Sequence, residues 1–135
     1  MLKPLILDRR GDFAQFAFVA PVLILVSIGL VNLAMFGIAG VNASNAANYG
    51  ARIGSVSQRH QIQRAKAAAL SKLETMPFGD YSVSVVGGAV RGSLISVRVT
   101  YTVDNYFAGL GSLFGTDVNP KLTKTVVAYF RQEGW

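Results

Sequence analysis

The sequence predicts an α+β protein: a long N-terminal transmembrane helix followed by a small antiparallel sheet packed against helix. Three observations support this fold class. Residues 13–38 form an uncharged apolar run, and residues 37–54 repeat small side chains at helical spacing. The second half of the chain alternates apolar and polar residues at the period of a β-strand. A length of 135 residues allows one small domain beside such a helix.

The run Phe13–Ile38 is long enough to cross a membrane. It has 26 residues and no charge, whereas about 20 apolar residues span the hydrocarbon core of a bilayer. A helix in a soluble core has a distinct polar face, and this run is apolar on every side. Lys3, Arg9 and Arg10 precede it, so the positive-inside rule predicts a cytoplasmic N-terminus. We therefore expect a single-pass inner (cytoplasmic) membrane protein whose C-terminal domain is periplasmic or extracellular.

A cleaved secretory signal is the alternative interpretation of the run. Val41 and Ala43 have the small side chains that a signal peptidase requires near its cleavage site. The apolar region of a secretory signal is about 7–15 residues long, however, and this run is much longer. Its length favours a membrane anchor that contacts lipid.

Small residues continue beyond the run. Ala43, Ala47, Gly50 and Gly54 recur every three or four positions, so on a helix they form a flat face that a second backbone can approach closely. We interpret this face as a helix-packing interface for a partner subunit; a flexible linker is the alternative. The predicted division is a cytoplasmic leader (1–12), a transmembrane helix with a helical outer extension (13–54) and an extracytoplasmic α+β domain (55–135).

The predicted outer domain has one helix and three strands. Ser57 is the expected N-cap of a helix from about Gln58 to Thr75, and the sequence leaves open whether this helix is separate from the first. The apolar face of the sheet needs a cover, and we expect Ile62–Leu73 to supply it. The predicted strands are Tyr81–Val86, Leu94–Asp104 and Lys121–Arg131, joined by a turn (87–92) and a glycine-rich apolar insert (105–120).

The residues predict no catalytic, cofactor or metal site. The chain has no cysteine, and its one histidine, His60, is expected to be solvated on a basic helix. The carboxylates beyond the apolar run are scattered without metal-ligand spacing: Glu74, Asp80, Asp104, Asp117 and Glu133. The net charge of +6 is spread along the chain, which indicates a basic surface and no nucleic-acid partner.

Several motifs near the N-terminus occur together. They are the entry Arg9-Arg10-Gly11, the triplet Gln15-Phe16-Ala17, Pro21 within the apolar run, and the segment Asn45–Gly54, which contains Gly50-Ala51-Arg52. Together they resemble the TadE-like (TadE/TadG) minor pseudopilin family of the tight adherence (Flp) type IV pilus system. The resemblance covers residues 1–55 and implies a pilin-like fold, membrane anchoring, and partners among other pilins or pilus assembly proteins.

The resemblance also implies a candidate prepilin processing site at Gly11 and Asp12. Gln15 stands where the family has a glutamate, and one residue closer to the glycine. In pilins that glutamate neutralises the amino terminus of a neighbouring subunit inside the membrane. Because a glutamine carries no charge, we expect an uncut chain that acts beside the filament base.

The expected function is therefore that of a membrane-anchored structural subunit that assists assembly or presentation of a tight adherence pilus. The alternative is an adhesive or ligand-binding module tethered to the membrane by a single span. Its contact surface would be the apolar part of the insert, Phe107–Phe114.

Overall fold

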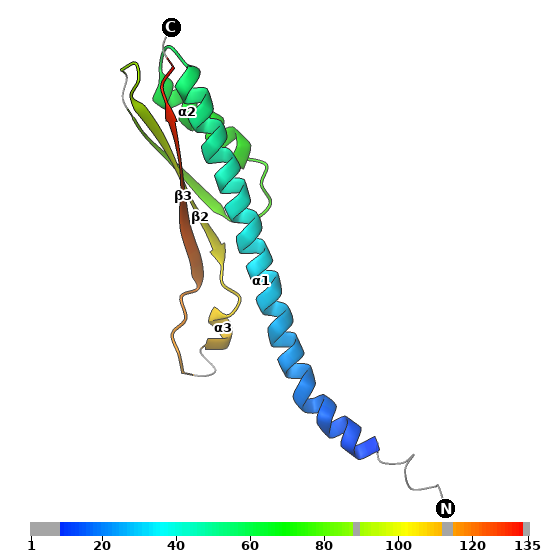
Figure 1. Ribbon diagram of the computed structural model, residues 1–135. Coiled ribbons are helices and arrows are strands. Elements are labelled where there is room, and N and C mark those ends of the chain that lie inside the picture. The colour runs from blue at the N-terminus through cyan, green and yellow to red at the C-terminus, as the bar shows by residue number, and fades with distance from the viewer. Residues whose placement is uncertain (1–8, 88–89, 112–114, 134–135) are drawn as a thin grey trace, which may run out of the picture.

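The computed structural model describes residues 9–87, 90–111 and 115–133. A long apolar N-terminal helix is followed by a three-stranded antiparallel sheet and further helices, so the predicted α+β, pilin-like layout is confirmed. The first helix, α1, runs along the whole molecule, and its N-terminal part projects beyond every other element (Figure 1).

Helix α1 (Arg9–Val56) is continuous over 48 residues, which makes it about 72 Å long at 1.5 Å per residue. It is a few residues longer than predicted at both ends, and Pro21 lies inside it. Residues 9–12 of the predicted leader are thus helical, because extending an existing helix costs much less than starting one. By length and composition, its segment Gln15–Val56 is able to cross a membrane.

Helix α2 (Gln61–Leu73) is separate from α1 and returns antiparallel to it. The prediction that Ser57 caps it was wrong. His60 occupies the N-cap in the left-handed region, with φ 55° and ψ 39°, while the Ser57 hydroxyl donates to the Ile53 carbonyl at 2.6 Å. Ser57 thus satisfies the open end of α1, and the left-handed residue reverses the chain within a short loop.

The sheet has the order β1-β2-β3, with both pairs antiparallel. Its strands are β1 (Asp80–Gly87), β2 (Leu94–Asp104) and β3 (Lys121–Arg131), which agree closely with the predicted ranges. Two cross-strand threonine pairs lie on the face away from the helices, Thr100 with Thr125 at 2.8 Å and Thr102 with Thr123 at 3.0 Å. Gly88 and Ala89 of the predicted turn lie outside the described residues.

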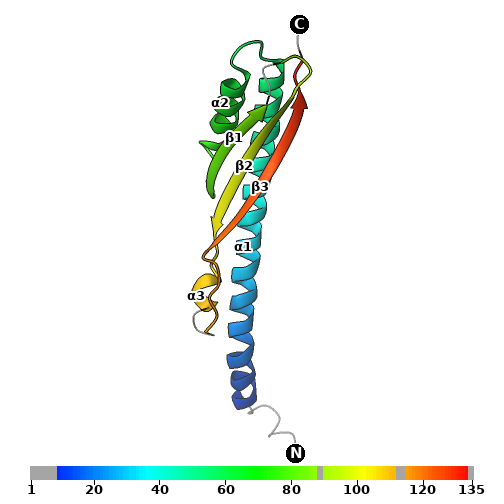
Figure 2. The same cartoon turned by 90° about the vertical axis from the view of Figure 1, so that its left-hand side faces the viewer.

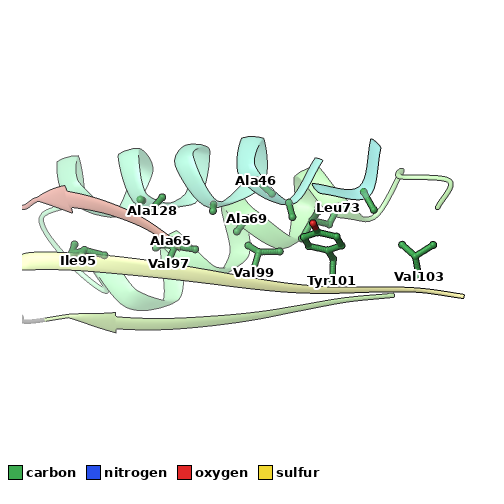
Figure 3. Packing of buried hydrophobic residues seen from close by; sticks show 14 residues of the cluster. Ala46, Ala65, Ala69, Leu73, Ile95, Val97, Val99, Tyr101, Val103 and Ala128 are labelled. Atoms are coloured by element: carbon green, nitrogen blue, oxygen red, sulfur yellow. The ribbon is translucent and has the colours of Figure 1, made fainter. Parts of the chain in front are cut away.

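The core lies between the inner face of the sheet and the part of α1 that begins at Ala39 (Figure 2). The buried apolar side chains of β2 are Ile95, Val97, Val99, Tyr101 and Val103, and they face the helices (Figure 3). The prediction that Ile62–Leu73 covers the sheet was wrong in its main part. Helix α1 covers β2 and β3, whereas α2 lies chiefly against α1 and β1, and Ile62 is 42% exposed. Helix α1 packs on the sheet through alanines, whose small side chains let the helix approach the strands closely.

Candidate functional site

The small-residue face of α1 forms a close helix–helix contact within the chain. Ala43 and Ala47 are completely buried, and Gly50 and Gly54 are also buried. A Cβ atom added at Gly50 would lie 2.7 Å from the carbonyl oxygen of Ala65, and one added at Gly54 would lie 2.8 Å from the Cβ of Ala65. The face therefore fits the backbone of α2 without room for a larger side chain.

This contact corrects the role predicted for Ala43, Ala47, Gly50 and Gly54. Gly50 and Gly54 do pack against a helix, but that helix is α2 of the same chain, and Ala43 and Ala47 are buried in the core of the same domain. In this fold Gly50 and Gly54 are covered by α2. Small-residue spacing predicts close approach of a backbone, but it does not say whether that backbone belongs to the same chain.

The residues that carry the family resemblance are not brought together. Gln15 and Phe16 are exposed on the projecting part of α1, whereas Ala51 is buried in the core and Arg52 is exposed beside it. The candidate processing site, Gly11 and Asp12, lies within the first turns of α1. It is therefore part of the helix backbone.

The projecting part of α1 exposes large apolar side chains in every direction. Phe18 is 81% exposed and Leu30 is 63% exposed. The other exposed residues of this kind between Phe13 and Leu33 are Phe13, Phe16, Val19, Val22, Leu23, Ile24, Leu25, Val26, Val31 and Leu33. An apolar surface of this extent is unusual in water and is typical of a helix that contacts lipid or other helices.

The insert between β2 and β3 lies beside this apolar helix and includes the short helix α3 (Ala108–Gly111), as Figures 1 and 2 both show. Asn32, only 5% exposed, donates from Nδ2 to Oδ1 of Asn105 at 3.4 Å and accepts the Tyr106 amide at 3.5 Å. The Phe107 ring lies against Gly29, since a Cβ there would be 3.0 Å from it. Leu113 and Phe114, predicted on the apolar side of the insert, lie outside the described residues.

Two apolar grooves flank α3 where it meets α1. The larger, of about 590 Å³, is lined by Ser27, Ile28 and Val31 of α1 and by Tyr106, Gly109 and Leu110 of the insert. The other, of about 370 Å³, is lined by Leu25 and by five insert residues that include Phe107 and Val118. The sequence analysis did not predict the contact between the insert and α1. Asn32 could have indicated it, because a polar residue inside an apolar run usually has a partner.

Charged side chains form few interactions with one another in the described part of the chain. It contains no group of three or more His, Asp or Glu side chains placed to hold a metal ion. Lys121 and Asp80 form an exposed ion pair at 3.8 Å, and His60 is exposed at the turn before α2.

Burial, with a smaller contribution from Tyr81, raises the pKa of Tyr101 above its ordinary value of 10.0. This phenol packs against the ring of Phe36 with 5.2 Å between centroids, and it therefore belongs to the core.

Comparison of the chain with protein-family models, with curated proteins and with solved structures found no match.

Proposed function

We propose that this protein is a membrane-anchored structural subunit of the pilin-like class. The observation that carries the proposal is the division of α1 into two parts. Up to about Leu33 the helix exposes large apolar side chains wherever the insert does not cover it, and from Ala39 it forms part of the core of the small outer domain. A helix that is both anchor and domain core suits a subunit that is held in a membrane and associates with other helices there.

Within that class, the motifs of residues 9–54 favour a TadE-like pseudopilin of the tight adherence (Flp) pilus system. The cytoplasmic side of the inner membrane would hold the N-terminus, and the sheet domain would lie outside. Its partners would be other pilins or pilus assembly proteins. They would contact the exposed part of α1, since α2 covers the small-residue face.

The adhesive alternative is less well supported. It requires the insert to be displayed to a surface ligand, but Tyr106 and Phe107 lie against Asn32 and Gly29 on the apolar helix. That position is close to the expected membrane and on the opposite end of the sheet from the C-terminus (Figure 1).

The test combines gene deletion with site-specific crosslinking in the native bacterium. Deletion should reduce piliation and surface attachment, and the wild-type gene should restore both. A photo-crosslinking amino acid at Leu23, which is exposed on α1, should form an adduct with a pilin-like membrane subunit identified by mass spectrometry. The matched control is the same reagent at Tyr129, which is exposed on the sheet domain and should give no adduct with that subunit. Normal piliation after deletion, with no protein adduct at Leu23, would reject the proposal.

A further inference from the structure

The insert contacts α1 at the level where a membrane would end. Counting about 20 residues from Phe13 places the far boundary of the hydrocarbon core near Asn32. The insert meets the helix there through Asn32 and Tyr106 and continues towards the N-terminus of α1, since Phe107 lies at Gly29 and Leu110 lines grooves with Leu25 and Ile28. From Asn32 to Leu25 this is a descent of about 10 Å along the helix axis.

The composition of the insert suits an apolar medium. No charged residue occurs between Asp104 and Asp117. Tyr106, with its amphipathic ring, lies at the boundary, which is where tyrosines gather in membrane proteins. The more apolar Phe107 and Leu110 lie on the bilayer side of that boundary. Side chains of the insert thus become more apolar towards the expected bilayer interior, as the polarity of the membrane itself decreases in that direction.

Most backbone amides of residues 105–111 donate hydrogen bonds within the chain. Phe107 donates to Oδ1 of Asn105 at 3.1 Å, and the amides of Ala108, Leu110 and Gly111 donate to insert carbonyls at 3.0 Å. Lipid offers backbone amides no hydrogen-bond acceptor, so irregular structure enters a membrane only when its polar groups are paired in this way. The amides of residues 105–108, 110 and 111 meet that requirement.

We propose that the first half of the insert, residues 105–111, enters the membrane leaflet nearest the sheet domain, and that the larger groove holds an acyl chain of a phospholipid of that leaflet. The groove wall formed by Ile28 and Val31 is continuous with the exposed apolar surface of α1, whose neighbouring Leu30 is 63% exposed. A lipid chain that covers Leu30 therefore has an apolar path into the groove. The inference rests on the membrane anchoring in the proposed function and adds to it a lipid site.

Depth-dependent fluorescence quenching tests the immersion. The full chain with its single tryptophan replaced, Trp135→Phe, would be reconstituted in phosphatidylcholine vesicles brominated either near the headgroup or at mid-chain. A Leu30→Trp reporter in the span, a Leu110→Trp reporter and a Tyr106→Trp reporter should all be quenched, Tyr106→Trp most by the shallow bromines. A Val90→Trp reporter, at an exposed position in the β1–β2 connection, should keep its fluorescence.

The reporters separate the failure of this inference from that of the proposed function. Quenching of Leu30→Trp without quenching of either insert reporter would keep the anchor and overturn the immersion of the insert. Absence of quenching at Leu30→Trp would reject the membrane anchor itself. Two insert reporters are used so that poor folding of one variant does not decide the result.

Groove occupancy is tested by native mass spectrometry of the full chain released from a mild detergent. The wild type should retain one phospholipid, and Gly109→Phe, which adds a bulky ring at a position that lines the groove, should lose it. Gly37→Phe is the matched control, because both glycines face open space but Gly37 does not line the groove; it should retain the lipid. Equal lipid retention in the two variants, or a lipid-free dimer of the wild type, would overturn the acyl-chain site.

Discussion

Asn32 and Asn105 are 73 residues apart in the sequence, and their side-chain amides meet at 3.4 Å on the apolar helix. Asn32 also accepts the Tyr106 amide, so one buried side chain holds the insert to α1 through two hydrogen bonds. In Asn32→Leu both bonds are lost, at a cost of about 1 kcal/mol each. We expect faster hydrogen exchange at the Tyr106 amide, measured by mass spectrometry in detergent. Asn48→Leu is the control, because Asn48 bonds only the Ser44 carbonyl of its own helix. Unchanged protection in Asn32→Leu would show that the insert is held by other contacts.

Gly50→Ala should destabilise the outer domain. The added methyl group would meet the Ala65 carbonyl oxygen at 2.7 Å, and overpacking of this kind costs about 1–3 kcal/mol. Gly37→Ala adds the same group to the same helix where nothing lies within 4 Å, and it should leave stability unchanged or improve it. Thermal denaturation of both variants, followed by circular dichroism, measures the difference. If Gly50→Ala folds normally but fails only in pilus assembly, the face has an intermolecular role after all.

Alkaline pH should destabilise the fold through Tyr101. The unfolded chain begins to lose this phenolic proton near pH 10.0, whereas the folded chain keeps it because burial raises the pKa of Tyr101. The unfolded state therefore binds fewer protons above pH 10, and the free energy of unfolding falls until the folded pKa is passed. Tyr101→Phe should show a smaller fall in melting temperature above pH 10 than the wild type. The exposed Tyr129→Phe is the control, and equal slopes for the wild type and Tyr101→Phe would contradict the assignment.

A reporter enzyme that is active only outside the cytoplasm should work when fused after Trp135. The positive residues Lys3, Arg9 and Arg10 precede the apolar run, and the positive-inside rule predicts that such residues stay in the cytoplasm. The same reporter fused before Met1 should be inactive. Activity of the fusion before Met1, with no activity of the fusion after Trp135, would contradict the proposed topology.

We predict that the membrane-bound protein keeps the peptide bond between Gly11 and Asp12. Gln15 cannot neutralise a new amino terminus as a glutamate does, so cleavage would leave a positive charge at the membrane without that partner. Mass spectrometry of the N-terminal peptide from membrane fractions measures this. Gln15→Glu restores the carboxylate and tests whether cleavage then appears. Wild-type protein that starts at Asp12 and is recovered in sheared filaments would show instead a processed pilin.

Much of the fold follows from residue periodicity. The alternation of Leu94–Asp104 predicts a strand with the observed ends, since one face of the sheet carries the apolar core residues. The turn after α1 was not predictable in the same way, because His60 takes a left-handed conformation that its residue type does not require. For the candidate site, the small-residue face predicted close packing but not its partner. The contact between Asn32 and the insert depends on long-range topology, which no local pattern records.

Because α1 is continuous, it fixes the rotation about the helix axis between its contact with the insert and its contact with the core. Asn32 holds the insert and Ala39 begins the core, and both lie on the side of the helix that faces the sheet domain. Each residue of an α-helix advances the direction of its side chain by about 100°. One residue inserted between Asn32 and Ala39 would therefore turn the insert's anchor point away from the sheet domain while raising that domain by only about 1.5 Å. The rotational position of the outer domain relative to the insert is therefore set by the number of residues in about two turns of α1.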